Sequence, residues 1–190
     1  MTSKSGSPEA DIAKGNIALL YSAAAIGQRV QALADEIARR ERAGDEPLVL
    51  VGLLSGAVPF ATDLSRALVE RGVSLAIDYV RASSYAGTAS TGAVALEGRP
   101  SFAVAGRDVL IVDDILDTGL TLEAVLAAFG REAPARLSSC VLLDKRARRL
   151  NGLTADFVGF SCPDLFVVGY GMDLDGRFRE LPFIGTIASP

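Results

Sequence analysis

Apolar segments of strand length, separated by helical patterns, constrain the fold of this chain most strongly. Three of them are PLVLVGLLSG from Pro47 to Gly56, RDVLIVDD ending at Asp114, and RLSSCVLLD ending at Asp144. A strand without a regular polar face is expected where a sheet is covered on both sides. The sequence therefore predicts an α/β fold, with a mostly parallel twisted sheet flanked by helices.

Helical patterns fall between these segments. Apolar residues recur every three or four positions from Ser22 to Arg42, which predicts an amphipathic helix ending near Gly44. Further helices are predicted from about Pro59 to Glu70 and from Leu120 to Phe129. SLAIDYVRA is another strand candidate, and DFVGF and LFVVGYGMD predict short strands separated by turn residues near the end of the chain.

The chain of 190 residues has the length of a single domain, residues 1–190, without an internal repeat. Residues 1–10 are small and polar and predict a disordered terminus. Residues 83–98 are rich in Ser, Thr, Gly and Ala and follow neither period. Because long loops in compact domains often close over a site, this segment predicts a flexible lid.

Composition excludes several kinds of chemistry. The chain has no histidine, so proton transfer must use Asp, Glu, Lys, Tyr or Cys, and triads or zinc sites that need imidazole are ruled out. Its net charge of −4 argues against a globally basic nucleic-acid binder. Cys140 and Cys162 match no metal-ligand spacing and predict reduced core residues. Without a signal sequence or ~18 consecutive apolar residues, a cytoplasmic protein is expected.

The stretch VLIVDDILDTGLT, from Val109 to Thr121, carries the clearest functional signal. Ligands of such sheets bind beyond the carboxyl ends of the strands, where Asp113 and Asp114 lie. Side chains alternate along a strand, so only one of the two acids should face a given pocket unless the backbone turns. The following Asp117-Thr118-Gly119 predicts a tight loop before a helix, whose exposed N–H groups suit a phosphate.

Carboxylates beside a phosphate cradle would repel a bare anion. They are reasonable if the ligand also presents hydroxyl groups, or brings a divalent metal ion that joins the acids to phosphate oxygens. A phosphorylated sugar meets both requirements. The simpler interpretation is that these acids only cap and solvate the end of a strand.

Other nucleotide and phosphate motifs fit less well. Receiver domains also end a strand in paired acids, but near the start of the domain, whereas Asp113 and Asp114 lie in the middle of this chain. A Walker A loop requires a Gly-Lys pair, which the chain lacks. The dinucleotide fingerprint fails because Gly169-x-Gly171 continues to Leu174 instead of a third small residue.

Five segments, in order from Pro47 to Gly185, together resemble one family. VLIVDDILDTGLT resembles the phosphoribosyl-pyrophosphate motif of type I phosphoribosyltransferases, and VGLLSGAVPF is similar to the pyrophosphate loop of their 6-oxopurine branch. SSYAGTASTG resembles the lid, LLDKRARR the purine-selecting lysine segment, and PDLFVVGYGMDLDGRFRELPFIG the hood. The chain is identified as a member of the hypoxanthine phosphoribosyltransferases, with a small hood subdomain that includes residues 156–185.

The resemblance implies a sugar-phosphate half of the site. Asp113 and Asp114 would contact the ribose hydroxyls, directly or through magnesium (Mg2+). The 5-phosphate would be held by Asp117, Thr118, Gly119, Leu120 and Thr121. Asp117 would also be the catalytic residue, accepting a proton from N7 of the purine. Many relatives carry lysine where this chain has Leu120.

The resemblance also implies a purine half. Lys145 would donate to the 6-oxo group, Phe166 would stack on the ring, and the Val167 backbone would contact the edge of the base. An ammonium has donors and no acceptor, which would distinguish a 6-oxo from a 6-amino purine. By residue type alone, Lys145 opens a basic run that is typical of a solvated surface, and Phe166 would be a core residue.

Pyrophosphate and a second magnesium contact complete the implied site. The loop Leu54-Ser55-Gly56, together with Arg179, would bind pyrophosphate. Ser84 and Tyr85 would close over it, while Asp173 would bind Mg2+ near the purine. Many relatives have lysine at the position of Ser55, so a positive charge is missing here. In the family this loop binds through backbone N–H groups and has a cis peptide before that residue.

Taken together, the sequence predicts a magnesium-dependent purine-salvage transferase. It would convert hypoxanthine, and also guanine, with phosphoribosyl pyrophosphate into IMP or GMP and pyrophosphate. Its partners would be these small molecules, without nucleic acid or membrane, and relatives assemble as homodimers or homotetramers. Two alternatives remain at this stage: a nucleic-acid-binding regulator with the same fold, and a xanthine-preferring phosphoribosyltransferase.

Overall fold

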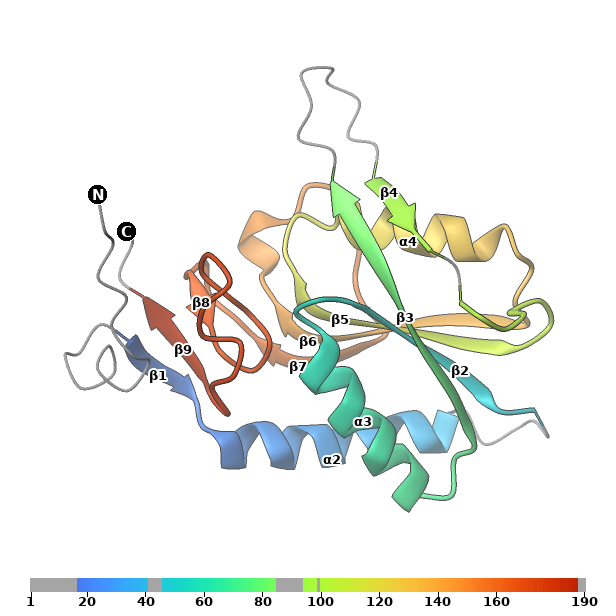
Figure 1. The fold of residues 1–190 in the computed structure, drawn as a ribbon, viewed down its shortest axis with the longest axis horizontal. Coiled ribbons are helices and arrows are strands. Elements are labelled where there is room, and N and C mark those ends of the chain that lie inside the picture. The colour runs from blue at the N-terminus through green and yellow to red at the C-terminus, as the bar shows by residue number, and fades with distance from the viewer. Residues whose placement is uncertain (1–16, 41–45, 85–93, 99, 188–190) are drawn as a thin grey trace.

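A computed structural model describes residues 17–40, 46–84, 94–98 and 100–187 of the chain (Figure 1). Its strands form two sheets, a six-stranded sheet in the order β4-β3-β2-β5-β6-β7 and a three-stranded sheet in the order β1-β9-β8. The elements are β1 (Ile17–Tyr21), α2 (Ala23–Arg40), β2 (Leu48–Leu54), α3 (Val58–Glu70), β3 (Leu75–Ser84), β4 (Val94–Glu97), β5 (Asp108–Leu116), α4 (Leu120–Gly130), β6 (Arg136–Asp144), the 3-10 helix η1 (Arg146–Arg148), β7 (Phe157–Ser161), β8 (Val167–Val168) and β9 (Ile184–Ile187).

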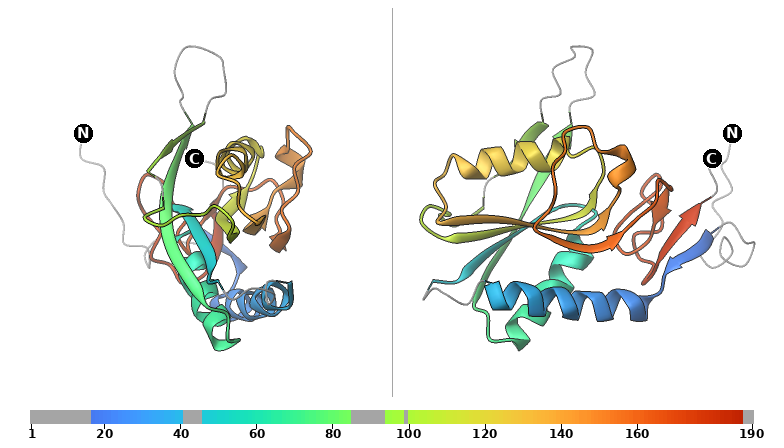
Figure 2. Two further views of the ribbon diagram at one scale, coloured as in Figure 1. Left: turned by 90° about the vertical axis from the view of Figure 1, so that its right-hand side faces the viewer. Right: turned by 180° about the vertical axis from the view of Figure 1, so that it is seen from behind.

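The large sheet is mostly parallel, which confirms the predicted fold class. β2 pairs in parallel with both β3 and β5, β5 pairs in parallel with β6, and β6 with β7; only the β3–β4 pair is antiparallel. Helices α2 and α3 lie on one face of this sheet and α4 on the other (Figures 1 and 2). The carboxyl ends of the central strands therefore meet at one edge.

Alternation along the buried strands explains why they have no polar face. Leu50 and Leu110 belong to the core formed with α2 and α3, whereas their neighbours Val51 and Ile111 belong to the core formed with α4. All four side chains are fully buried. Each face of a strand must be apolar because each is covered by a helix, as the continuous apolar runs predict.

The small sheet joins the two ends of the chain. β1 pairs antiparallel with β9, and β9 pairs antiparallel with β8. We call this sheet and the turns between β8 and β9 the hood; it stands at one end of the large sheet (Figure 1). Residues 156–185 were predicted to belong to the hood, but β7 pairs in parallel with β6 and forms an edge of the large sheet. Strand pairing, which the local sequence does not reveal, assigns β7 to the large sheet.

Two other predictions about strands need correction. Residues 83–98 are not irregular throughout, because β3 extends to Ser84 and pairs with β4, with Ser84 opposite Val94. The antiparallel ladder gives these small residues backbone partners that their composition does not suggest. Residues 85–93, the centre of the predicted lid, lie outside the described residues, as do residues 1–10 and the predicted helix end near Gly44.

The second correction concerns β5, which continues two residues beyond the predicted end at Asp114, to Leu116.

Both cysteines, Cys140 and Cys162, are free and buried, as predicted. None of the helices in the described residues has the length and apolar character that crossing a membrane requires.

Candidate active site

A cavity of about 470 Å³ lies between the carboxyl ends of β2, β5 and β6 and the hood. Twelve residues predicted from the sequence line it: Leu54, Ser55, Gly56, Asp113, Asp114, Asp117, Thr121, Lys145, Phe166, Val167, Asp173 and Arg179. Thr118 and Gly119 line a smaller adjoining cavity, while Leu120 is absent from both linings. Ser84 ends β3, and Tyr85 lies outside the described residues.

Asp113 and Asp114 form an acidic corner at the end of β5. Asp113 is only 8% exposed, and its carboxylate accepts a hydrogen bond of 3.0 Å from the Asp114 backbone N–H. Burial raises the pKa of Asp113 well above its ordinary value of 3.8, and the adjacent Asp114 carboxylate raises it further. The corner is therefore electrostatically unfavourable by itself, and a cation or hydroxyl donors would relieve it.

Both acids reach the same cavity, although strand alternation predicts that they point to opposite faces. Asp113 also lines the small cavity beneath the 117–121 loop, whereas Asp114 lies against Gly56 on the other side. The large cavity extends around the end of β5, so it receives side chains from both faces of the strand. Both acids therefore line the pocket, as the family resemblance implied, although β5 continues to Leu116 and the turn predicted directly after Asp114 comes two residues later.

Asp117 to Thr121, which we call the phosphate loop, connects β5 to α4. Gly119 adopts φ +88°, a conformation that glycine tolerates at the start of the helix. The first N–H groups of a helix lack partners within the helix and can bind an anion. Within the described residues, the buried Oδ1 of Asp117 has no hydrogen-bond partner, although the Arg148 Nε lies 3.2 Å away as an ion pair.

Lys145 and Phe166 face the cavity from opposite sides of the boundary between sheet and hood. Lys145 follows β6, is 5% exposed, and donates one hydrogen bond of 2.7 Å from Nζ to the Leu165 carbonyl. Phe166 directly precedes β8 and remains 44% exposed. An exposed phenylalanine ring beside a cavity offers a flat apolar surface on which a planar base can stack.

The 54–56 loop, β5 and the hood lie so close together that two positions, Gly56 and Gly171, have no room for a side chain. A Cβ at Gly56 would lie 1.8 Å from the Asp114 Oδ2 atom. A Cβ at Gly171 would lie 2.0 Å from the Gly56 carbonyl oxygen, and Gly171 also has φ +99°. The peptide between Leu54 and Ser55 is cis, as the family resemblance implied. Glycine is therefore needed where these three segments meet.

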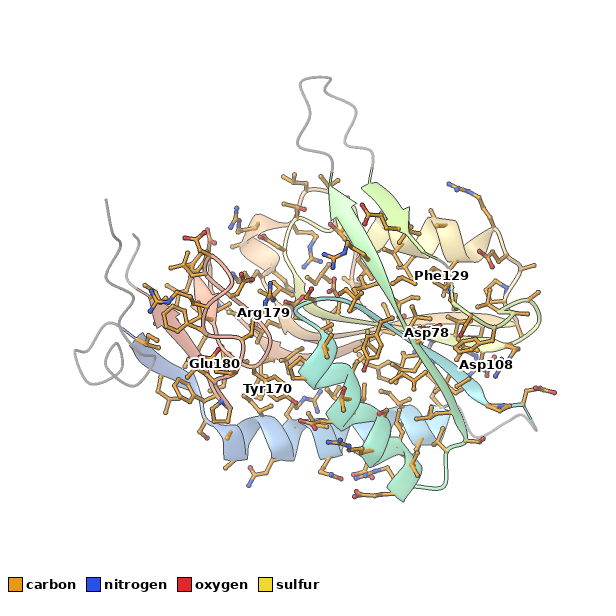
Figure 3. All side chains as sticks on the ribbon, viewed as in Figure 1. Asp78, Asp108, Phe129, Tyr170, Arg179 and Glu180 are labelled. Carbon is orange, nitrogen blue, oxygen red and sulfur yellow. The ribbon has the colours of Figure 1, made fainter. Side chains whose placement is uncertain are left out.

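Asp173 and Arg179 bring a second charged pair to the cavity from the hood. Arg179 Nη2 lies 2.7 Å from Asp173 Oδ1, and Arg179 also donates to the Gly171 carbonyl. Asp173 Oδ2 accepts a hydrogen bond of 2.7 Å from the Gly176 N–H. Arg179, labelled in Figure 3, comes from the turns that precede β9. The hood thus presents both a cation and an anion to the cavity.

Two functional candidates in the basic run after Lys145 were not predicted from the sequence. Arg148 lines the cavity and forms its ion pair with Asp117, while the Arg149 side chain is only 8% exposed and contacts backbone near the phosphate loop. The run was interpreted as a solvated surface apart from its first lysine. Nothing in the run KRARR distinguishes the buried arginine from the exposed ones.

Comparison with known proteins gives a consistent result. The family model of the phosphoribosyl transferase domain matches residues 18–175. Hypoxanthine phosphoribosyltransferase of Escherichia coli is 40% identical over 92% of this chain and 97% of that protein. Hypoxanthine-guanine phosphoribosyltransferase of Aquifex aeolicus is 42% identical over 86% of this chain and 90% of that protein. A solved structure of Trypanosoma cruzi hypoxanthine phosphoribosyltransferase with the product IMP has a TM-score of 0.85, with 36% identity over 90% of this chain and 93% of that one.

Proposed function

This chain belongs to the hypoxanthine phosphoribosyltransferase family, and we propose that it is a purine-salvage enzyme acting on hypoxanthine and guanine. Each base reacts with phosphoribosyl pyrophosphate to form IMP or GMP and pyrophosphate. The observation that carries this proposal is the cavity itself, which brings together an acidic corner, a phosphate loop, a buried lysine and an exposed aromatic ring. These groups match the sugar, the phosphate and the planar 6-oxopurine.

The sugar-phosphate half of the substrate binds at the end of β5. Asp113 and Asp114 accept hydrogen bonds from the ribose hydroxyls, which relieves the repulsion between the two carboxylates. The N–H groups of the phosphate loop and the Thr118 and Thr121 hydroxyls hold the 5-phosphate at the start of α4. Support comes from the cavity linings, because Asp113 and Thr121 line both the large cavity and the smaller adjoining cavity that Thr118 and Gly119 line.

Asp117 is the proton acceptor of the reaction. The bond between the anomeric carbon and pyrophosphate breaks, a purine nitrogen bonds to that carbon, and the N7 proton passes to the Asp117 carboxylate. The acceptor must be a carboxylate or another group present in the cavity, because the chain contains no histidine. The Asp117 Oδ1 atom, which has no hydrogen-bond partner within the described residues and lies 3.2 Å from Arg148 Nε in an ion pair, takes that proton.

The purine binds between β6 and the hood. Lys145 has three N–H donors and gives one to the Leu165 carbonyl, so another is available for the 6-oxo oxygen. A 6-amino group would place a donor against this ammonium, which accounts for rejection of adenine. Phe166 stacks on the ring and the Val167 backbone contacts its edge.

Pyrophosphate leaves along the 54–56 loop. Backbone N–H groups of Leu54, Ser55 and Gly56 bind it with Arg179, and Ser84 and Tyr85 close over it. Because Ser55 has no charge, we assign to Arg179 the positive charge that the protein places beside the leaving group. Exclusion of water during the transfer requires the segment that contains Tyr85.

The carboxylates fit a magnesium ion. Mg2+ prefers oxygen ligands and commonly takes one or two carboxylates from the protein together with substrate phosphate oxygens and water. The burial of Asp113 and its repulsion by Asp114, which together raise the pKa of Asp113, make an environment that such an ion relieves. Asp113 and Asp114 would hold one ion, and Asp173, which is paired with Arg179 in this structure, would hold another. Magnesium supplies charge neutralisation of the developing pyrophosphate.

We also expect a cytoplasmic enzyme that forms a homodimer or homotetramer, by analogy with the family. A solved T. cruzi relative was studied for the role of its C-terminal region in oligomeric state and activity. The nucleic-acid-binding alternative is not favoured, because the chain has a net charge of −4 and its relatives carry enzyme names. The xanthine-preferring alternative is an outcome of the experiment that follows.

The test is pyrophosphate release from phosphoribosyl pyrophosphate with hypoxanthine, guanine, xanthine or adenine, with Mg2+ and again with excess chelator. We expect turnover with hypoxanthine and guanine that stops in chelator. Turnover with xanthine alone would replace the proposed base preference, and turnover with adenine alone would remove the role of Lys145. Inactivity with every base would overturn the proposed function.

A further inference from the structure

Arg149 differs from its neighbours in the basic run after β6. Its side chain is 8% exposed, compared with 75% for Arg146 and 50% for Arg148. A guanidinium has five N–H donors and keeps its charge at any physiological pH, so burying it is unfavourable unless those donors are satisfied. The question is which groups satisfy them.

Four oxygen atoms accept hydrogen bonds from Arg149. Nε donates to the Asp117 carbonyl at 2.8 Å, and Nη2 donates to the Leu116 carbonyl at 3.0 Å. Nη2 also donates to the Asp144 carboxylate at 2.5 Å, and Nη1 donates to the Leu153 carbonyl. The guanidinium therefore joins the end of β5, the end of β6 and the segment before β7.

Two of these contacts support the phosphate loop. Leu116 is the last residue of β5 and Asp117 is the first residue of the loop, so their carbonyls determine how the backbone enters it. The aliphatic stem lies below the turn of the loop, because a Cβ at Gly119 would come within 2.8 Å of Arg149 Cδ. Arg149 thus contacts the backbone at the start of the loop, and its side chain does not line either cavity.

The third contact extends to the purine half of the site. Asp144 ends β6 and directly precedes Lys145, whose backbone N–H donates to the Leu116 carbonyl at 3.0 Å. The same carbonyl thus accepts hydrogen bonds from both Lys145 and Arg149. A planar guanidinium can hold these acceptors in fixed relative positions, which a flexible lysine with a single ammonium cannot do.

We propose that Arg149 is a positioning residue that couples the phosphate loop to the purine-binding lysine. It holds the peptide carbonyls that open the loop and the carboxylate next to Lys145 in one rigid arrangement. Substrate groups on both sides of the anomeric carbon are then presented at a constant separation, on which transfer depends. This inference rests on the proposed function, because it assigns both halves of the site to one reaction.

The decisive experiment compares Arg149→Lys with Arg146→Lys. Arg146 is the matched control, because its Nε lies 3.1 Å from the same Asp144 carboxylate, but its side chain is exposed. We expect Arg149→Lys to raise the KM values for both phosphoribosyl pyrophosphate and hypoxanthine by roughly tenfold and to lower kcat, since a lysine ammonium cannot reach the four acceptors that the guanidinium bonds from three nitrogen atoms. Arg146→Lys should stay within about twofold of the original enzyme.

The folded fraction is measured by circular dichroism in the same samples. A merely structural role would lower the active fraction without changing either KM, and that result would overturn the inference. Binding of ribose 5-phosphate, measured by calorimetry, provides a readout that does not require turnover; we expect it to weaken in Arg149→Lys. An inactive parent enzyme would count against the proposed function, whereas unchanged kinetics in Arg149→Lys would count against Arg149 alone.

Asp144→Asn provides a second test if Arg149→Lys does not fold. It weakens the link to Lys145 and retains the hydrogen bonds from Arg149 to the Leu116 and Asp117 carbonyls. The expected result is a larger rise in KM for hypoxanthine than for phosphoribosyl pyrophosphate. Equal changes, or no change, would show that Arg149 does not couple the two halves.

Discussion

Asp78 in β3 and Asp113 in β5 are carboxylates of the same sheet in opposite electrostatic situations. Asp78, labelled in Figure 3, accepts hydrogen bonds from the Ser101 N–H at 2.8 Å, the Ser101 hydroxyl at 2.9 Å and the Tyr79 N–H at 2.8 Å. These bonds, led by the Ser101 N–H, lower the pKa of Asp78 below its ordinary value. Burial beside a second carboxylate raises the pKa of Asp113 instead.

The difference distinguishes a carboxylate whose hydrogen bonds are satisfied within the protein from a carboxylate that faces a cavity. Asp78 is satisfied within the protein, where it attaches the segment after β4 to β3. Asp113 receives one backbone N–H from its neighbour and otherwise faces a cavity. Carboxylates at the carboxyl edge of the sheet should therefore affect activity with little effect on stability, and those elsewhere should do the reverse.

The largest effect is expected for Asp117→Asn. An amide cannot accept the purine proton, so kcat should fall roughly 10²- to 10⁴-fold. The variant has almost the same shape, so the melting temperature and the affinity for IMP should change little. Pyrophosphate release, thermal unfolding and calorimetry measure the three quantities. An unchanged turnover rate would show that Asp117 is not the proton acceptor. It would also contradict the expectation that carboxylates at the carboxyl edge of the sheet affect activity.

Gly56→Ala should have the next largest effect, through crowding instead of charge. The new Cβ would meet the Asp114 carboxylate and force it to move, so kcat/KM should fall at least about tenfold. Gly27→Ala is the matched control, because it lies in α2 with nothing within 4 Å of the new Cβ. The control should keep its activity and gain about 0.5–1 kcal/mol of stability. Equal activity in the two variants would contradict the assigned position of Asp114.

Phe166→Leu tests the exposed aromatic ring at the hood. Loss of stacking should raise the KM for hypoxanthine by roughly five- to tenfold, corresponding to about 1 kcal/mol at the lower end of base stacking energies. Stability should not change, because the ring is 44% exposed. Leu165→Ala removes an equally exposed apolar side chain that does not line the cavity, and should leave this KM unchanged. The KM for hypoxanthine and the melting temperature are measured for both variants and for the parent protein.

Asp78→Ala should have the smallest effect, on stability alone. Its hydrogen bonds are partly solvated, so their removal should cost about 0.5 kcal/mol near neutral pH. Because the folded-state pKa of Asp78 is lowered, its contribution is present above the ordinary value of 3.8 and is lost as pH falls through the folded-state value. The melting temperatures of the variant and the parent protein should therefore converge as the pH falls below 3.8. A loss of activity in Asp78→Ala at neutral pH would contradict the expectation that carboxylates away from the carboxyl edge of the sheet affect stability alone.

Local patterns were sufficient to predict most of the large sheet. The apolar run of β2 and the helical spacing of α3 each appear within one segment, so the elements formed close to their predicted positions. The hood was harder to predict, because β1 pairs with β9 across nearly the whole chain and β8 has only two residues. Pairing over such distances leaves no periodicity in either short segment.

In the candidate site, too, some residues could be predicted from the local sequence and others could not. Residue type and spacing, together with the family resemblance, predicted Asp113, Asp114 and Asp117, and all three line the cavity. Arg149 could not be identified in this way, because its burial depends on oxygen atoms at the ends of two strands, and one of them belongs to Leu116, 33 residues earlier in the chain. A basic residue in a run of basic residues has no sequence signal for such a role.

The sequence by itself determined which segments are covered on both faces and which chemical groups the site contains, because burial and residue chemistry are recorded position by position. Only the tertiary structure decided how both acids of the pair reach one cavity, that Gly56 must accommodate the Asp114 carboxylate, and which arginine is buried. These outcomes depend on distances between segments remote in sequence. Such distances are set by how the strands and the hood pack, and no local pattern encodes them.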